Sequence, residues 1–338
     1  MGNETNKKWR WGVNRWLILF LIILSVYAAG AFAPIMPHIQ LPAERVSQEP
    51  LFTLPIIGDF YLTNTLVATL LADVVLIVIS LVVRRASRSG KQVLSGFASA
   101  VEAIIEALYN LVETTAGKWA QTILPFFATI VLLVLVANWM ELIPGVDTIG
   151  FLEHSEHGFK AQEVIPGVET IVKGTPEHGE EGFVLVPFVR AAATDLNFTM
   201  ALALVSVVMT QVIGLRALGP RYFGKFLNVG NFLKMWRQPR LGPFDVMLPF
   251  IDIFVGILET VAEFAKILSF TFRLFGNIFA GAVLLFVLGS LLPAIQSGVI
   301  LLELFFGLIQ ALVFGMLTMM FMTMAVQSHH DEHEESHA

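Results

Sequence analysis

Cysteine is absent from the 338 residues of this chain, and charged residues make up only 14% of it. The absence of cysteine excludes disulfides, thiol chemistry and cysteine-ligated metal centres. The shortage of charge is equally informative, because soluble domains carry about 25% charged residues. Hydrophobic residues make up 56% of the chain and the mean hydropathy is +0.73, so the composition excludes a soluble globular protein. The formal net charge of -6 gives no indication of nucleic-acid binding.

The apolar residues gather into runs that are long enough to cross a bilayer as helices of about 20 residues. These runs cover residues 16–36, 61–83, 121–142, 196–215, 249–289 and 294–326. The first run follows a basic segment, so residues 1–60 form an N-terminal extension with either a signal peptide or an extra membrane helix. The other runs predict an all-α polytopic membrane protein with five core transmembrane helices over residues 61–328, followed by a polar His-rich and acidic tail at 329–338.

The basic residues predict which side of the membrane each loop faces, because cytoplasmic loops are enriched in Lys and Arg. Segments 84–120 and 216–240 are rich in basic residues, whereas the enlarged loop at 143–190 is acidic. The sequence therefore predicts cytoplasmic termini and an outer loop at 143–190. Residues 92–117 repeat apolar side chains at helical spacing, which indicates an amphipathic helix on the cytoplasmic membrane surface.

The outer loop contains a near-repeat, ELIPGVDTI at 141–149 and EVIPGVETI at 163–171. Pro-Gly marks a turn in each copy, so we expect a duplicated turn element packed against the outer membrane face, without chemistry of its own. The segment EHSEH at 153–157 and the tail have donor atoms for a metal, but a solvated loop and a disordered tail are the preferred interpretation. No cofactor and no metal site are predicted.

Asp73 is an ionisable residue inside the second apolar run. Such intramembrane carboxylates are functional candidates by default, because they are costly to bury in lipid. Asp73 lies far from the C-terminal runs in sequence, so we expect it to form a hydrogen bond between helices.

The last two apolar runs are too long for ordinary membrane spans. As a helix, residues 249–289 would measure about 60 Å, twice the hydrocarbon core of about 30 Å. Average tilts of about 20° do not absorb this excess. We therefore predict a long, strongly tilted helical hairpin that turns at residues 289–293. An oblique helix presents an extended flank, which favours contact with a large partner.

Lys266 and Arg273 are the only basic residues of this hairpin, and both lie inside its first helix. Lys266 has Glu263 one turn away, so either a local ion pair or a role in an ion path explains it. Arg273 has no acidic residue one turn away, and a charge at mid-membrane is costly. Because a guanidinium is ionised at any pH, the counter-charge of Arg273 is expected on another helix or another subunit.

Polar residues on the two helices indicate a path on each side of Arg273. On the first helix the polar residues recur three or four positions apart and form one stripe that includes Asp252, Glu259, Glu263, Lys266, Arg273 and Asn277. On the last helix Glu303 lies near the outer end, and Gln310 follows two turns later. This arrangement predicts two aqueous half-paths separated by a fixed positive charge. A mobile carboxylate on another subunit would carry a proton or a sodium ion past that charge.

The segment AKILSFTFRLFGNIFAG at 265–281 resembles the signature of subunit a of the rotary, F-type ATP synthase membrane sector. The resemblance extends to ANWMELIPG at 137–145 and to ATDLNFTMALAL at 193–204. It implies a proton-translocating stator subunit of a bacterial plasma membrane, not an enzyme on its own. Its two offset half-channels would load and unload the carboxylates of a rotating c-ring and so couple proton flow to ATP synthesis. The other implied partners are peripheral-stalk b subunits and further ATP synthase subunits.

The resemblance also assigns residues to the barrier between the half-channels. Arg273 matches the essential arginine of the family, which separates the half-channels and meets the ring carboxylates. Asn277 matches the asparagine one turn later, and Gln310 matches the glutamine packed close to that arginine. The resemblance therefore implies that these side chains act together.

The remaining assignments concern the two paths. Glu259 and Ser269 match polar positions associated with the cytoplasmic path, and Glu303 falls where the family places a polar group of the outer path. The sequence departs from the family at Ala282, where many members carry Glu or His. Because Ala282 has no polar side chain, we expect Glu303 to supply more of the polar groups of the outer path.

The residues alone leave two other classes of function open. A stand-alone secondary transporter would use Arg273 to bind an anionic substrate, but transporters commonly have repeated halves with interrupted helices, which these spans lack. A non-conducting membrane scaffold would leave the charge of Arg273 in the middle of a membrane helix unexplained. The transported ion is either a proton or a sodium ion. Ion selectivity in the family lies largely in the ring, so the residues of this chain do not decide between the two ions.

Overall fold

The computed structural model describes most of the chain outside its ends. The described residues are 43–47, 49–55, 58–88, 96–143, 146–166, 168–172, 182–226, 243–291 and 293–327, with a few isolated positions between 15 and 27. Most of these residues are helical, which confirms the predicted all-α membrane class. The N-terminal apolar run falls largely outside the described residues, and the tail falls entirely outside them.

Long helices form the body of the protein. They are α2 (Asn64–Ser87), α3 (Phe97–Ala116), α4 (Ala120–Glu141), α5 (Leu196–Leu218), α7 (Pro243–Leu291) and α8 (Pro293–Val326). Short 3-10 helices follow or precede them: η1 (Gly117–Trp119), η2 (Val146–Thr148), η3 (Ala192–Thr194) and η4 (Gly219–Lys225). Within the described ranges, 5 helical stretches are long and apolar enough to cross a membrane, and they include the five predicted core spans. The chain is an integral membrane protein.

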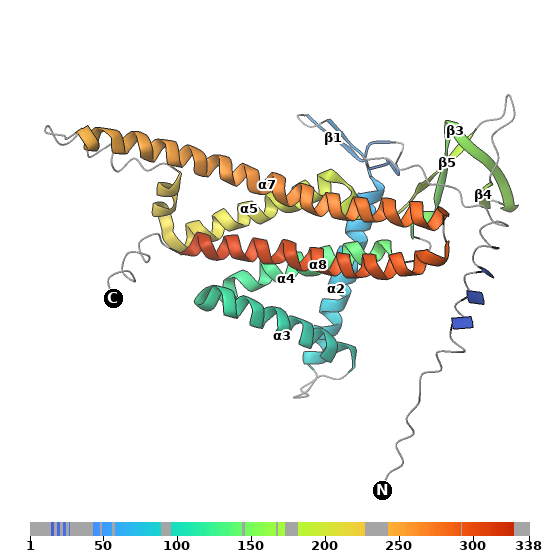
Figure 1. Cartoon of the computed structure of the whole chain (residues 1–338), viewed down its shortest axis with the longest axis horizontal. Helices are drawn as coiled ribbons and strands as arrows, with labels where there is room; N and C mark the ends of the chain where they lie inside the picture. Colours follow the sequence, from blue (N-terminus) through green and yellow to red (C-terminus); the bar gives the residue numbers. More distant parts are fainter. Residues whose placement is uncertain are drawn as a thin grey trace, which may run out of the picture.

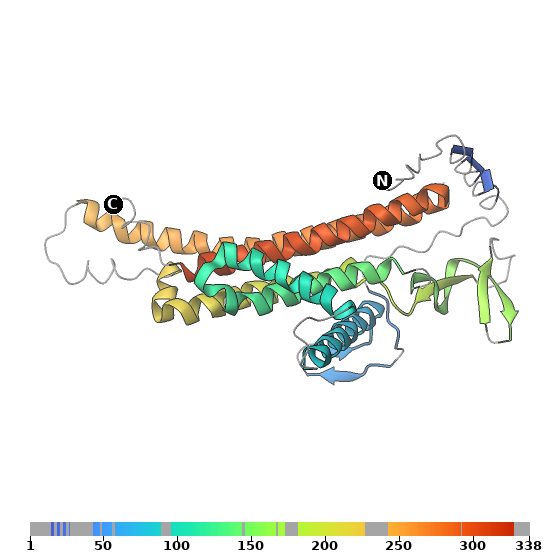
Figure 2. The ribbon, with the colours of Figure 1, turned by 90° about the horizontal axis from the view of Figure 1, so that it is seen from below.

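The helices pack in layers and together form an elongated bundle. Helices α4, α5, α7 and α8 run side by side along the long axis, and α2 crosses them steeply (Figure 1). Figure 2 shows α7 and α8 on one side of α4 and α5, with α2 on the other. With 24 residues α2 is about 36 Å long and fits the hydrocarbon core, whereas α7 with 49 residues extends about 74 Å. The predicted long hairpin is confirmed, and its helices run obliquely to α2.

The starts of α2 and α5 are joined by their capping groups. Thr63 caps α2 by accepting a hydrogen bond from the backbone N–H of Leu66, and Asp195 caps α5 by accepting one from Asn197. The hydroxyl of Thr65 also donates to Asp195 Oδ2 at 2.9 Å. Such side-chain caps satisfy backbone donors that a helix start leaves open. They fix the segment before α5 against α2.

Apolar side chains fill the contact between the layers. The cluster beside the middle of α7 contains Phe270, Leu274, Phe314, Val134 and Ala203 from α7, α8, α4 and α5. A second cluster joins α3 to α4 and α8, and buried Val112 shows that the predicted amphipathic helix packs one face on the bundle.

The outer surfaces of α2 and α7 expose apolar side chains, as lipid- or partner-facing helices do. Ile77 of α2 and Phe272 of α7 are both more than half exposed, each at 57%. Asp73 is half-buried on α2, and it has no hydrogen-bond or ion-pair partner within the described part of the chain. The predicted hydrogen bond between helices is not formed among these residues, because the neighbouring surface of α2 is mostly unpacked.

The segments outside the bundle form two small antiparallel sheets that were not predicted. Strands β1 (Phe52–Leu54) and β2 (Gly58–Phe60) pair before α2, and strands β3 (Gly150–Ile165), β4 (Val168–Val172) and β5 (Phe183–Pro187) form a sheet of order β4-β3-β5. The two copies of the near-repeat differ: one ends α4 and forms η2, whereas the other forms the β3–β4 turn. The prediction of a duplicated structural element is wrong, because local sequence similarity is overridden by the different partners of each copy.

Candidate functional site

Helices α7 and α8 pair antiparallel and bring two of the predicted polar residues, Asn277 and Gln310, into contact. Asn277 Nδ2 donates to Gln310 Oε1 at 2.7 Å, and Gln310 is only 2% exposed. Closer to the hairpin turn, one turn from Asn277 on α7 and two turns from Gln310 on α8, the carboxylate of buried Glu303 lies against the backbone of Gly281, where a Cβ atom would overlap with it. The absence of a side chain at Gly281 therefore makes room for Glu303.

Arg273 lies one turn from Asn277 on α7 and is exposed. No carboxylate or hydrogen-bond acceptor contacts its side chain within the described ranges. The predicted polar stripe straddles the edge of the buried face, because Glu263 and Phe270 face the bundle whereas Arg273 and Asn277 do not. The structure pairs Gln310 with Asn277, and the described hydrogen bonds of Gln310 do not include Arg273.

On the far side of Arg273, Lys266 forms the local ion pair that was one of its two interpretations. Lys266 Nζ lies 2.8 Å from Glu263 Oε1 and 4.6 Å from the ring centre of Phe321 on α8. A cation over an aromatic face is attracted by the ring. Glu259 is half-buried and Ser269 is exposed, so this half of the site is open at the edge of α7.

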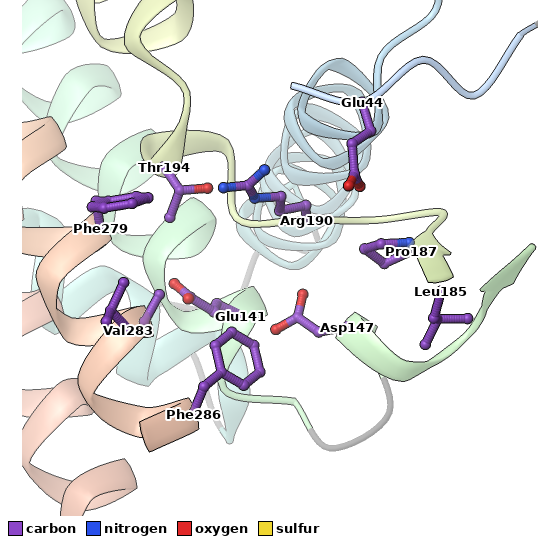
Figure 3. A pocket seen from close by; sticks show the side chains of 11 residues that line it. Glu44, Glu141, Asp147, Leu185, Pro187, Arg190, Thr194, Phe279, Val283 and Phe286 are labelled. Atoms are coloured by element: carbon purple, nitrogen blue, oxygen red, sulfur yellow. The ribbon is translucent and has the colours of Figure 1, made fainter. Parts of the chain in front are cut away.

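A pocket lies near the hairpin turn, between the end of α4, the segment after β5 and the side of α7. Its polar lining comes from Glu44, Glu141, Asp147, Arg190 and Thr194. Figure 3 shows the carboxylates of Glu141 and Asp147 directed into the space between Arg190 and the apolar side chains of α7. The pocket therefore combines a cationic group with several carboxylates in an otherwise apolar wall.

The end of α4 is held beside Glu303 by side-chain hydrogen bonds to α8. Asn138 Nδ2 donates to the carbonyl of Gly307 at 3.3 Å, and Trp139 Nε1 donates to that of Leu304 at 3.0 Å. Glu141, at the end of the same helix, is close enough to Glu303 for their negative charges to repel. The charge of Glu141 in the pocket therefore influences Glu303 in the hairpin.

Asp147 lies outside the membrane-spanning helices. Burial raises its pKa from the usual value of 3.8 to about 6, and the nearby Arg190 guanidinium opposes that rise. A carboxyl group with this pKa exchanges protons readily in the neutral to weakly acid range.

Ala282 lines this pocket at the position where the sequence departs from the resembling family. Carboxylates beside it come from Glu141 and Asp147, which the sequence analysis did not select. Glu141 closes an apolar run, so the rule that carboxylates at membrane depth are functional candidates applies to it. Glu44 gave no comparable signal, because it stands in a polar segment, whereas Arg190 is an isolated charge between the apolar residues 183–189 and 191–193.

Comparisons with known proteins agree with these features. The family described as ATP synthase A chain matches residues 66–323. ATP synthase subunit a of Mycobacterium ulcerans is 27% identical over 277 residues, covering 80% of this chain and 90% of that protein. ATP synthase subunit a of Myxococcus xanthus is 35% identical over 167 residues, covering 45% of this chain and 50% of that protein. The match includes the central arginine helix, its partner helix and the helices behind them, and the chain belongs to the ATP synthase A chain family.

Proposed function

We propose that this chain is the proton-translocating stator subunit of an F-type ATP synthase in a bacterial plasma membrane. The observation that carries the proposal is Arg273, an exposed guanidinium in the middle of α7 without a partner among the described residues. Such a charge is tolerated at membrane depth when a second subunit supplies the counter-charge. The carboxylates of a ring of small hairpin subunits have the required charge and mobility.

The pocket near the hairpin turn supports an outer half-channel. A proton would enter past Asp147 and Arg190, pass Glu141 and reach Glu303. From there the bonded pair of Asn277 and Gln310 leads to the exposed edge of α7. We therefore assign the hairpin-turn end to the outside and the C-terminus to the cytoplasm, as the basic loops predict.

The inner half-channel would lie on the other side of Arg273. Glu263 and Lys266 form an ion pair there, and Glu259 and Ser269 lie along the accessible edge of α7. A proton released from the ring would leave along these groups. The ring and the peripheral-stalk b subunits would complete the walls that this chain leaves open.

The mechanism follows from the charge of the carrier. A protonated ring carboxylate is neutral and can rotate through lipid, whereas an ionised one is attracted to the guanidinium of Arg273. The fixed charge therefore holds the ionised carboxylate between the two half-channels and repels a proton that would pass directly. Several charges must cross for each ATP, since one charge gains only about 2.3 kcal/mol per 100 mV.

Replacement of Arg273 by alanine tests the proposal. In vesicles containing the assembled complex, Arg273→Ala should abolish ATP-driven proton pumping, because the ring carboxylate loses its electrostatic partner. Arg221→Ala, which removes an exposed arginine of η4, is the matched control and should pump normally.

Purification of the complex adds a second criterion. Small hairpin subunits should copurify with both variants, whereas their absence from the wild-type preparation would favour a stand-alone transporter. Normal pumping by Arg273→Ala would show that Arg273 is not the barrier.

A further inference from the structure

The interface between α7 and α8 is arranged in successive levels. From the hairpin turn inward, Glu303 faces Gly281, and Gln310 is bonded to Asn277. At the next level an aromatic pair follows, formed by Phe270 and Phe314 with ring centres 5.0 Å apart. Polar groups therefore stand on one side of an aromatic level.

Charged groups stand on the other side of the same level. The ring centre of Phe321 lies 5.7 Å from that of Phe270. Lys266 Nζ lies over the face of the Phe321 ring, 4.6 Å from its centre. Lys266 in turn pairs with Glu263 at 2.8 Å. The aromatic level thus lies between the two groups of ionisable residues.

We infer that Phe270, Leu274 and Phe314 form a dry septum that separates the two half-channels behind α7. Their exposed fractions are 3%, 0% and 1%, and Ile130, Val134 and Ala203 of α4 and α5 close the layer. This inference depends on the proposed half-channels and adds a second barrier, made by this chain alone. Arg273 would block the direct passage of a proton at the exposed edge of α7, and the septum would block it at the buried face.

Hydrogen-bonding groups at the levels concerned support this division. The hydroxyls of Thr271 and Thr318 donate to carbonyls of their own helices, at 2.8 and 3.0 Å, so they offer no free donor to water in the septum. By contrast, Gln310 Nε2 is buried without a hydrogen-bond partner in the described part of the chain. Buried polar groups of this kind are usually satisfied by water, whereas apolar cavities stay dry.

The septum has a consequence for coupling. Among the described residues of the α7–α8 interface, water that reaches Gln310 from the outside meets the apolar side chains of Phe270, Leu274 and Phe314 before the level of Lys266. An ion must therefore leave the interface at the level of Asn277, on the side that faces the ring. The route behind α7 is closed without any charge being placed there, which avoids the cost of burying one.

Labelling of single introduced cysteines tests where water reaches, and because this chain has no natural cysteine, any label on it reports the introduced one. In vesicles of the assembled complex, a water-soluble, membrane-impermeant thiol reagent should modify Glu303→Cys and Gln310→Cys from the outside. Phe270→Cys and Phe314→Cys should react at least about tenfold more slowly from either side, because the reactive thiolate forms only where the sulfur is hydrated.

The outcomes separate the septum from the proposed function. Equal reactivity of Phe314→Cys and Gln310→Cys would overturn the septum and leave the outer half-channel intact. Silence at both Glu303→Cys and Gln310→Cys would overturn the outer half-channel, and the septum with it.

Passive proton leak gives an independent measurement with Arg273 in place. Phe314→Ser should raise the leak of the nucleotide-free complex by about tenfold, because the cavity and hydroxyl admit water. Phe314→Leu should leave the passive proton leak at the wild-type level. Phe127→Ser, at a fully buried phenylalanine of α4 outside the septum, controls for packing defects in general. An equal leak from Phe127→Ser, or a tight Phe314→Ser complex, would overturn the inference.

Discussion

The outer and inner halves of the α7–α8 hairpin are built differently. In the outer half, ionisable and amide groups come from separate elements: buried Glu141 from α4, partly buried Arg190 from the segment before η3, and buried Glu303 and Gln310 from α8. In the inner half the principal contact is the pair of Glu263 and Lys266 within α7.

The difference suggests a contrast between the two proposed paths. The residues of the proposed outer half-channel come from α4, α7, α8 and the segment after β5 of this chain, so we expect its geometry to depend little on a partner. The inner half lies along an open edge, where Ser269 is exposed and Glu259 only half-buried. A partner surface must supply its missing wall. Single substitutions should therefore act more strongly in the outer half than in the inner half.

The largest expected contrast compares two glutamates, one from each half. Glu303→Gln should slow proton transport by about tenfold or more without dissociating the complex, because it removes an enclosed acid–base group. Glu259→Gln should slow it by less than about threefold, since water at an open edge can substitute for one carboxylate. The initial rate of ATP-driven vesicle acidification measures both. Equal rates for the two variants would contradict the contrast between the halves.

A smaller effect is expected from the glycine that accommodates Glu303. In Gly281→Ala the new methyl group overlaps with the Glu303 carboxylate, which must shift. Such overpacking costs about 1–3 kcal/mol, so we expect slower transport and a lower thermal stability of the complex.

Gly298→Ala is the matched control, because a Cβ at this α8 position meets nothing within 4 Å. The control should transport normally and be equally or more stable, since alanine favours a helix. If Gly281→Ala matched the control in both measurements, the close packing of Glu303 on α7 would be unimportant for the path.

The sequence predicted those features that depend on local signals. Long apolar runs identified the five core helices, and the scarcity of charge made Arg273 and Lys266 conspicuous in the hairpin. Helical periodicity gave the relative positions of Arg273 and Phe270 on α7, but it could not say which faced the bundle. That depends on the packing of α7 against α8, which no local pattern encodes.

The outer pocket was missed for a related reason. Asp147 stands in an acidic loop, where a solvated side chain is the ordinary expectation. Its burial depends on α7, which follows about a hundred residues later in the sequence, and on Arg190 after β5. Strand β3 was missed because charged residues interrupt the alternation of apolar side chains that predicts a strand.

The smallest expected effect concerns the entrance of the outer half, where Asp147 has a pKa of about 6. Because this pKa is raised, the carboxylate charge is present above about pH 6 and is lost as the outer pH falls through that value. Above that pH the charge attracts cations, so wild type should take up protons about twofold faster than Asp147→Asn. Below it the protonated carboxyl resembles the amide, and the two rates should converge. Proton uptake at a fixed inner pH measures this, with Glu169→Gln of β4 as an exposed control that should match wild type throughout. A constant ratio between wild type and Asp147→Asn from pH 5 to 8 would remove Asp147 from the entrance, and the enclosed outer path would then begin at Glu141.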